Sequence, residues 1–253
     1  MTPGVRLLSF NIEGDLHLDK IGPFLKQQNA DVVCLQEVFL DDLPGLLGAD
    51  YRFHFLPMTL KTRQSGLASA WGTAIAHRLP GELAICDYYH RPTESLVPFS
   101  ETAKRPTIWH GVVGVQIASG SAAMNICTTH FTWTPDGAPD ANQRGDMANL
   151  LALMAREPPH VLSGDFNIPR KQNSLYGTLT QRYTDHVPER FTSSIYLPLH
   201  YVRNDPAKCA KLATYMVDYI FSTPGFCRIR DFEMHGGMSD HFGLSAEVMP
   251  FSP

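Results

Sequence analysis

The chain has 253 residues, of which 43% are hydrophobic and 18% are charged, and its formal net charge is -4. This composition is typical of a globular protein with enough apolar residues for a sizeable core. A protein that only coats nucleic acid usually carries an excess of Lys and Arg, so the negative balance argues against that role. It does not exclude a local basic rim or a bound cation.

Five cysteines are present, and no two of them have the spacing of a CxxC motif. Cys34 and Cys127 lie in strand-like apolar runs, where a free Cys behaves as a small buried hydrophobe. We therefore interpret all five as reduced structural thiols, which favours a cytoplasmic location. The first ten residues lack the basic and long apolar regions of a signal peptide. No apolar run approaches the roughly 20 residues of a membrane span, so we expect no stable membrane insertion.

Short apolar runs recur along the chain and predict β-strands, because they are rich in β-branched and aromatic residues and bounded by Gly, Pro, Asn or Asp. The expected strands cover residues 5–10, 31–35, 51–56, 72–76, 83–87, 108–117, 124–129, 160–162, 215–221 and 244–248.

Two helices are predicted between these strands. The first, at residues 18–28, has one apolar face, although Pro23 lies near its start. The second begins with Asp140 and Gln143, which have the spacing of a capping box, and its apolar repeat continues to Met154. Strands thus outnumber helices, which suggests two packed sheets with helices on their outer faces.

The sequence contains no linker that would divide the chain, so we expect one domain over residues 1–253. Two stretches, 136–140 and 169–209, are expected to be irregular. The longer one mixes Pro, Asn, Asp and Arg with aromatic residues, which makes it a candidate loop on the substrate side.

Oxygen-bearing side chains follow the first two predicted strands. Asn11-Ile-Glu13 comes after residues 5–10, and Gln36-Glu37 ends the run that starts at residue 31. Mg²⁺ prefers an octahedral shell of oxygens with one or two carboxylates and several waters, so Glu37 is a candidate ligand and Asn11 can assist. An Asx turn at Asn11 and a solvated loop residue at Glu37 are the simpler explanations of each motif alone.

The segment Gly164-Asp-Phe-Asn167 follows the next short strand and is the most specific of the motifs. In an extended backbone, Asp165 and Asn167 would point to the same side. Asp165 can then hold an attacking water while Asn167 holds a phosphate oxygen. Gly164 permits a close backbone approach or an unusual φ angle. An ordinary turn is the alternative.

Three further motifs contain histidines or their candidate partner. His130 ends the strand at 124–129 and can hold a phosphate oxygen, unless it is simply a half-buried hydrogen-bonded residue. Asp218 interrupts an apolar strand, which is costly unless the charge is paired or exposed, and we interpret it as the partner of a histidine. Asp240 and His241 are adjacent, so in an extended backbone they point apart and have different tasks.

In this order, the motifs resemble those of the endonuclease/exonuclease/phosphatase superfamily of magnesium-dependent hydrolases, which includes exonuclease III, tyrosyl-DNA phosphodiesterases and DNase-like enzymes. The resemblance extends from Asn11 to His241. It implies an α/β (α+β) four-layer sandwich, in which two packed, mainly antiparallel sheets are flanked by helices. It also implies roles for the residues named above: Glu37, Asn11 and Asp240 on the metal side, Asp165 and Asn167 for water and phosphate, His241 as the catalytic histidine with Asp218 as its partner, and His130 for phosphate contact.

The function implied is Mg²⁺-dependent hydrolysis of a phosphodiester by in-line attack of water, with Mn²⁺ as an alternative cation. A nuclease or DNA-end phosphodiesterase is favoured. A sphingomyelinase-like or inositol-phosphate phosphatase-like enzyme remains open, as does an inactive binding module of the same fold. The sequence does not determine whether His241 or Asp165 activates the water. We expect a phosphoester substrate, DNA among the candidates, and a monomer.

Asn11-Ile-Glu13-Gly14 is similar to the corresponding segment of tyrosyl-DNA phosphodiesterases and exonuclease III-type nucleases, but these usually carry Asp in place of Glu13. This departure leaves a metal role for Glu13 undecided. Scattered basic and aromatic residues can form a rim that binds a nucleic-acid strand, although ordinary solvated charge is the simpler explanation. These residues are Lys61, Arg63, Lys104, Arg105, Arg170, Lys171, Arg182, Trp71, Trp133 and Tyr176.

Overall fold

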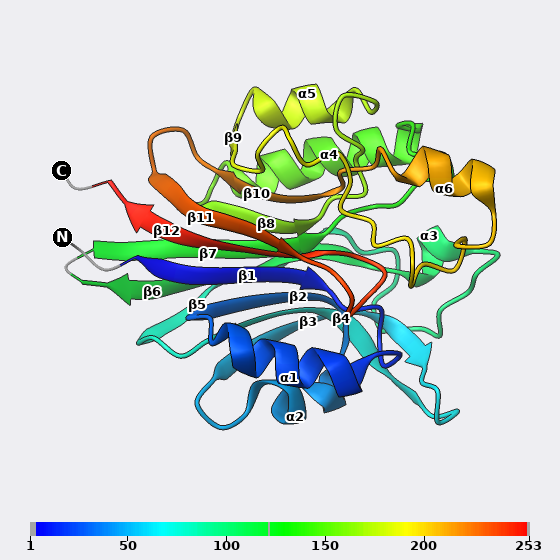
Figure 1. The fold of residues 1–253 in the computed structure, drawn as a ribbon, viewed down its shortest axis with the longest axis horizontal. Coiled ribbons are helices and arrows are strands. Elements are labelled where there is room, and N and C mark those ends of the chain that lie inside the picture. Colours follow the sequence, from blue (N-terminus) through cyan, green and yellow to red (C-terminus); the bar gives the residue numbers. More distant parts are fainter. Residues whose placement is uncertain (1–3, 121, 252–253) are drawn as a thin grey trace.

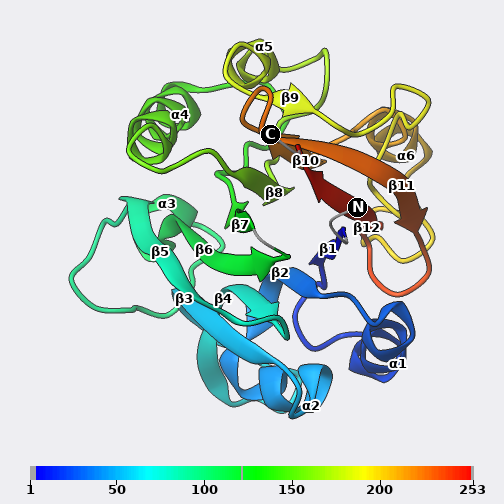
Figure 2. The ribbon, with the colours of Figure 1, turned by 90° about the vertical axis from the view of Figure 1, so that its left-hand side faces the viewer.

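A computed structural model describes residues 4–120 and 122–251. Two six-stranded sheets pack face to face, and helices cover both outer faces (Figures 1 and 2). The four-layer arrangement expected from the sequence is therefore confirmed. Within the described residues, no helix has the length and apolar character needed to cross a membrane.

The first sheet contains both ends of the described chain and is mostly antiparallel, with one parallel pair formed by its third and fourth strands. Its strands, in spatial order, are β11 (Cys227–His235), β12 (Gly243–Pro250), β1 (Val5–Asn11), β2 (Val32–Phe39), β4 (Ala68–His77) and β3 (Arg52–Thr62).

The second sheet has the same pattern, again with a parallel pair at its third and fourth positions. Its strands, in spatial order, are β5 (Gly81–His90), β6 (His110–Ser119), β7 (Ala122–His130), β8 (Val161–Asp165), β10 (Asp218–Ser222) and β9 (Thr184–Asp185).

Helices α1 (Leu18–Gln28) and α2 (Leu43–Leu47) cover the first sheet, and α4 (Ala141–Met154) and α5 (Leu175–Thr180) cover the second (Figure 2). Two short helices, α3 (Lys104–Thr107) and α6 (Pro206–Leu212), lie at one end of the sandwich (Figure 1). A 3₁₀ turn at Leu40–Asp42 precedes α2.

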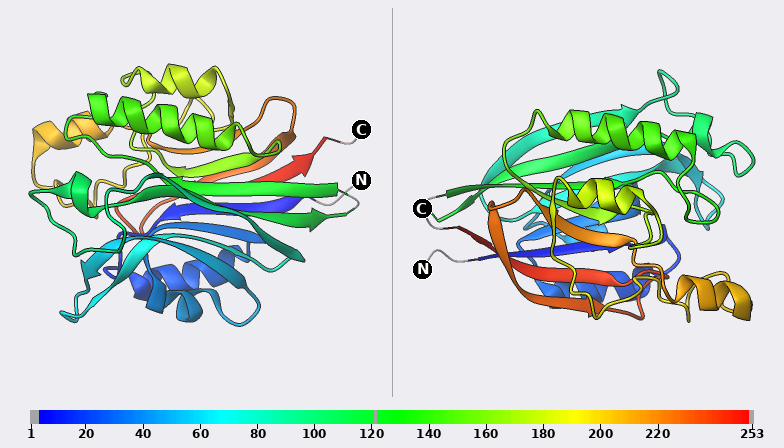
Figure 3. Two further views of the ribbon diagram at one scale, coloured as in Figure 1. Left: turned by 180° about the vertical axis from the view of Figure 1, so that it is seen from behind. Right: turned by 90° about the horizontal axis from the view of Figure 1, so that it is seen from above.

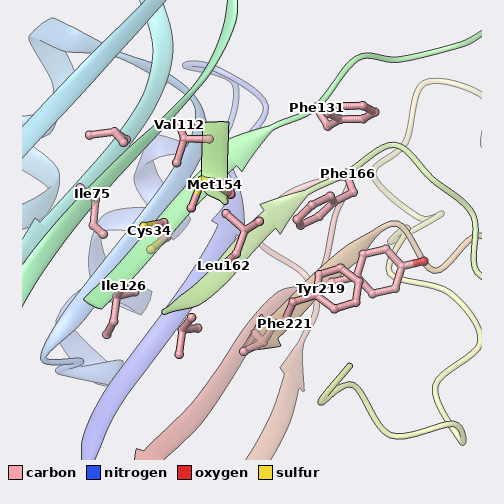
Figure 4. Close-up of a cluster of buried hydrophobic side chains, with 14 of the residues drawn as sticks. Cys34, Ile75, Val112, Ile126, Phe131, Met154, Leu162, Phe166, Tyr219 and Phe221 are labelled. Carbon is pink, nitrogen blue, oxygen red and sulfur yellow. The ribbon is translucent and has the colours of Figure 1, made fainter. Parts of the chain in front are cut away.

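Apolar residues that alternate along the strands form the core between the sheets. Cys34 and Ile75 of the first sheet and Ile126 and Leu162 of the second belong to one cluster of buried side chains (Figure 4). Phe166 packs edge-on against Tyr219 and Phe221 near the end of the second sheet (Figure 4). A second cluster fills the space between the first sheet and helices α1 and α2.

Most predicted elements are present, and the differences lie where polar or functional residues interrupt the pattern. Helix 18–28 has the predicted bounds, and Asp140 caps α4 by accepting a hydrogen bond from the Gln143 amide. The Gln143 side chain does not return to Asp140 but donates to the Thr132 carbonyl, so only half of a capping box forms. Strand β11 was not predicted, because its alternating charges resemble a polar loop.

The prediction of an irregular region at 169–209 is only partly correct. Helix α5, the two-residue strand β9 and the start of α6 lie within it. The predicted strand at 215–221 starts only at Asp218, and the strand at 160–162 continues to Asp165. All five cysteines are free, as expected, although Cys86 is exposed.

Candidate active site

A cleft of about 940 Å³ opens at the end of the sandwich where β1, β7 and β8 finish, on the right in Figure 1 and opposite both termini. All the residues assigned to the site from the sequence meet here. Asn11 and Asp218 lie buried beneath the cleft and are hydrogen-bonded to residues of its wall. The remaining residues line it directly: Glu37, His130, Asp165, Asn167, Asp240 and His241.

Strand register explains why residues distant in sequence become neighbours. His130 at the end of β7 is paired with Asp165 at the end of β8, and Asp165 is paired with Asp218 at the start of β10. Cross-strand partners project to the same face of a sheet. The three polar side chains therefore stand side by side at one end of the sheet.

Asp165 lies at the centre of this group. Its Oδ2 atom accepts a hydrogen bond from Asn11 Nδ2 at 3.1 Å and lies 3.6 Å from His130 Nε2 and 3.9 Å from His241 Nε2. Burial and the nearby charge of Asp218 raise the pKa of Asp165, and the two histidines oppose that shift. The carboxylate is thus held among three nitrogen atoms at the floor of the cleft.

His241 forms a buried pair with Asp218, whose Oδ2 lies 2.7 Å from His241 Nδ1. Burial alone would lower the pKa of His241, but the carboxylates of Asp218 and Asp165 outweigh it and raise the pKa well above its usual range. The imidazolium form is therefore favoured, with Nε2–H directed toward the side of Asp165.

The Asp165–Asn167 segment does not have the extended backbone that the sequence suggested. Asn167 has a φ of 52°, and its backbone N–H donates to Asp165 Oδ1 at 2.9 Å, as in an Asx turn. Its side-chain nitrogen donates to the Phe131 carbonyl, which leaves Oδ1 as its acceptor and fixes the amide at the cleft wall. Gly164 is required because a Cβ there would lie 2.0 Å from the Thr129 carbonyl oxygen.

Glu37 was expected at a strand end, but it lies in a β-bulge within β2. Strand β2 continues to Phe39, and its pairing with β4 shifts between Leu35 and Val38. The bulge gives Glu37 a φ of 58° and turns its side chain into the cleft, while the buried Gln36 amide donates to Thr128 of the facing sheet. A bulge is a common means of redirecting one side chain at a site.

The charge of Glu37 is stabilised by its surroundings. Burial would raise its pKa, but Lys61 Nζ at 3.7 Å from Oε2, His130 and a hydrogen bond from Asn11 lower it overall. Asn11 Nδ2 lies 3.1 Å from both Glu37 Oε1 and Asp165 Oδ2, while its Oδ1 accepts the Glu13 backbone N–H. With this amide orientation, Asn11 bridges the two carboxylates.

Two further carboxyl groups, those of Glu13 and Asp240, line the cleft and interact electrostatically with Glu37. Burial raises the pKa of Asp240 to about 6 and that of Glu13 to about 8, and repulsion between neighbouring carboxylates adds to both shifts. A divalent cation would relieve this repulsion and favour the charged forms. Carboxylate oxygens with water are the ligands that Mg²⁺ prefers, so these residues fit a magnesium site.

A tighter group of possible ligand atoms is formed by Asp165, Asp218 and His241, whose atoms lie within 4.8 Å of one another. His241 Nδ1 is already bonded to Asp218, and its raised pKa opposes the neutral form that a metal requires. The carboxylates around Glu37 therefore fit a cation better than this group does.

His200 lines the cleft beside Asp240 and was not selected from the sequence, because it lies in an irregular segment without a preceding strand. Its Nδ1 accepts the Val202 N–H, so Nε2 carries the hydrogen and lies 4.0 Å from Asp240 Oδ2. Burial and the charge of His241 lower the pKa of His200 to about 4. The cleft thus contains the neutral imidazole of His200 as a donor in addition to the protonated imidazole of His241.

The scattered basic residues separate into two groups. Lys61, Arg63, Lys104 and Arg105 line the cleft together with Trp71 and Trp133. Among the others, Arg170 is buried against Asp185, and Lys171 is exposed beside Glu189. Only the first group belongs to the site.

Comparison with known proteins agrees with this architecture. Residues 8–241 match the model of the endonuclease/exonuclease/phosphatase family. The chain belongs to this family. A search of the curated proteins finds no match.

Solved structures of the family share the fold at low sequence identity. An endonuclease/exonuclease/phosphatase protein from Beutenbergia cavernae is 18% identical with a TM-score of 0.67, covering 98% of this chain and 72% of its own. The human Nocturnin catalytic domain with bound sulfate is 15% identical with a TM-score of 0.66, and the match covers 98% of this chain and 94% of the Nocturnin chain. A humanized D. rerio TDP2 is 14% identical with a TM-score of 0.64, and the match covers 96% of this chain and 98% of the TDP2 chain.

Proposed function

We propose that this family member is a Mg²⁺-dependent phosphodiesterase that hydrolyses its substrate by in-line attack of water, with a nuclease or DNA-end phosphodiesterase as the favoured type. Mn²⁺ is the alternative cation. The observation that supports the proposal most strongly is the setting of Asp165. One carboxylate among the nitrogen atoms of Asn11, His130 and His241 can hold a water and place it next to a bound phosphate.

The side chains divide the chemistry between them. Asp165 orients the attacking water and accepts its proton, since its raised pKa makes it a better base than an ordinary Asp. His241, protonated and fixed by Asp218, donates Nε2–H to a phosphate oxygen on which negative charge develops. His130 and Asn167 complete the contacts to the phosphate from the ends of β7 and β8.

Glu37 is the proposed principal metal ligand, with Asp240 and Glu13 acting through the water shell of the cation. A bound Mg²⁺ would neutralise charge on the phosphate and on the departing oxygen. Asn11, expected on the metal side, has the proposed task of keeping Glu37 and Asp165 apart and oriented, because its amide bridges both.

Hydrolysis of bis-p-nitrophenyl phosphate with and without Mg²⁺ tests the proposal. Purified protein should release p-nitrophenolate, and EDTA should stop the reaction. The variant His241→Ala should lose at least about 100-fold in kcat/KM, as expected for a residue that stabilises charge in the transition state. Wild-type protein without turnover on a broad panel of phosphoesters would refute the proposal and favour a binding module without catalysis.

The natural substrate requires a separate panel. The similar structures include a TDP2 and the endonuclease domain of the telomere-specific retrotransposon TRAS1, which makes nucleic acid the first class to test. Abasic DNA, 5′-phosphotyrosyl DNA, single-stranded DNA, sphingomyelin and inositol phosphates should each be compared with and without Mg²⁺. Turnover of sphingomyelin with binding to vesicles would identify a lipid phosphodiesterase instead.

We also propose that residues 1–253 form a single catalytic domain that acts as a monomer in the cytoplasm. One cluster of buried side chains that includes residues of both sheets supports the single domain. Size-exclusion chromatography with light scattering tests the oligomeric state.

A further inference from the structure

The two walls of the cleft differ in chemistry. One wall comes from residues 61–64 and 99–108, around helix α3, and it includes Lys61, Arg63, Lys104 and Arg105. The other comes from residues 195–217, next to helix α6, where every lining side chain is apolar, aromatic or the neutral His200. Figures 2 and 3 show α3 and α6 on opposite sides of this end of the sandwich. The scissile phosphate would therefore lie between a cationic and an uncharged wall.

The four cations of the first wall are not equally available to a ligand. Arg63 donates to Asp42 at 2.6 Å, and Arg105 makes a bidentate pair with the buried Asp146 at 2.6 and 2.8 Å. Arg63 also lies 3.7 Å from Asp15, so each guanidinium already has carboxylate partners in the wall, and breaking such a pair leaves an uncompensated charge. We infer that both arginines shape the wall and do not bind substrate.

Lys61 and Lys104 are held differently. Lys61 Nζ lies 4.1 Å from the Trp71 ring centre and 3.7 Å from Glu37, and Lys104 Nζ lies 4.3 Å from the Trp133 ring centre. The acidic partner of Lys104 is Glu101, which is 74% exposed, and such surface pairs contribute little. Each ammonium group thus lies on an aromatic face and has one carboxylate neighbour, Glu37 for Lys61 and Glu101 for Lys104 at 3.1 Å, so each keeps further N–H donors for a ligand.

Lys61 is connected to the reaction centre through short contacts, and Lys104 lines the same cleft. The Trp71 ring contacts both Lys61 and His130, with its centre 5.8 Å from that of the His130 imidazole, and Glu37 lies 3.7 Å from Lys61 and 4.0 Å from His130. The Trp71 indole N–H is buried without an acceptor among the described residues. Trp133 follows His130 by three residues beyond the end of β7. A group bound at Lys61 and Lys104 would therefore lie next to the scissile phosphate.

We propose that Lys61 and Lys104, supported by Trp71 and Trp133, form a subsite for a second phosphate group of the substrate, adjacent to the one that is hydrolysed. This inference rests on the proposed function and specifies the substrate further. The substrate is an ester with at least two phosphate groups, and the second binds on the α3 side of the cleft. The next phosphate of a nucleic-acid strand and the phosphate of a small phosphorylated molecule share this chemistry.

Three esters with the same leaving group test the subsite: the p-nitrophenyl ester of thymidine 5′-phosphate, the same ester with an added 3′-phosphate, and the same ester extended to a tetranucleotide. The added phosphate should raise kcat/KM about tenfold, the value of one charge-assisted hydrogen bond. A full gain from the single phosphate indicates that a small molecule suffices. A larger gain in the tetranucleotide indicates a strand. Both outcomes support the subsite.

The variant Lys104→Met should abolish most of that gain, since it removes the charge and keeps an unbranched side chain of similar length. Lys171→Met is the matched control, because Lys171 is exposed outside the cleft, and it should retain the full gain. The gain should also shrink as salt is added. Turnover of all three esters at equal kcat/KM, or a gain that survives in Lys104→Met, overturns the subsite alone. No turnover of any ester overturns the proposed function and the subsite with it.

Discussion

The Asp218–His241 pair gives the sharpest prediction for a single substitution. Asp218→Asn keeps the shape of the side chain but removes its charge and offers an amide to His241 Nδ1. In the structure the two atoms are 2.7 Å apart, and Asp218 is 2% and His241 8% exposed. A hydrogen bond between charged groups in such a buried setting contributes about 1.5–3 kcal/mol. If that stabilisation acts in the transition state, kcat/KM should fall roughly 10- to 150-fold.

The pH dependence of the same variant tests the physical reason. The pKa of His241 is raised, so its charged form is present below that pKa and is lost as pH rises through it. Without the Asp218 carboxylate the pKa falls, and the alkaline decline of kcat/KM should begin at lower pH than in the wild type.

Initial rates on bis-p-nitrophenyl phosphate at saturating Mg²⁺, from acidic to alkaline pH, measure both effects. Asp31→Asn is the matched control, because Asp31 pairs with Arg78 near the start of β2, at the opposite end of that strand from the bulge that presents Glu37. A folded Asp218→Asn protein with an unchanged rate and an unchanged pH profile would refute the assignment of Asp218 as the partner that charges His241.

Three further predictions concern stability and metal binding. His110 is buried and its pKa is lowered to about 3, chiefly by burial, so it stays neutral in the folded protein. Lowering the pH from about 6.5 to about 5 should therefore reduce the free energy of unfolding by about 2 kcal/mol through this residue. In urea titrations, His110→Gln should lose less stability over that pH range than the wild type. Gly164→Ala should destabilise the protein by about 4 kcal/mol, because residue 164 has a φ of 133° and the new Cβ would meet a carbonyl oxygen of β7. Gly177→Ala is the matched control: residue 177 lies in helix α5 with open space around it, so this variant should be stabilised by up to about 1 kcal/mol. Glu37→Gln should weaken Mg²⁺ binding at least about tenfold by calorimetry, and equal affinity in the variant would exclude Glu37 as the ligand.

The sequence predicted the location of the site because polar residues stand out at the ends of apolar strands. His130 and Asp165 follow such runs, and Asp218 interrupts one. The register of β7, β8 and β10 then makes the three residues neighbours. The positions of polar residues at strand ends and the period of the hydrophobic residues are local properties, so they can be seen in a single sequence. The order of the motifs along the chain carried the family resemblance. The strand pattern and this resemblance together predicted the two-sheet fold.

Other features depend on long-range geometry and could not be predicted. The bulge that presents Glu37 arises where the pairing of β2 with β4 shifts, and the left-handed backbone of Asn167 is set by its bond to Asp165. His200 gains its place only because the chain between β9 and β10 folds back beside Asp240. The alternating charges of residues 227–235 did not predict a strand, although this segment forms β11 and pairs with β12 at the edge of the first sheet.

The central claim is that Asp165, with a cation bound beside Glu37, activates water for attack on a phosphodiester. A Mg²⁺ titration of bis-p-nitrophenyl phosphate hydrolysis by wild-type protein and by Asp165→Asn tests it most directly. We expect metal-dependent turnover by the wild type and a loss of at least about 100-fold in the variant, which should keep its Mg²⁺ affinity. Turnover that is independent of Mg²⁺, or that survives in Asp165→Asn, would contradict it.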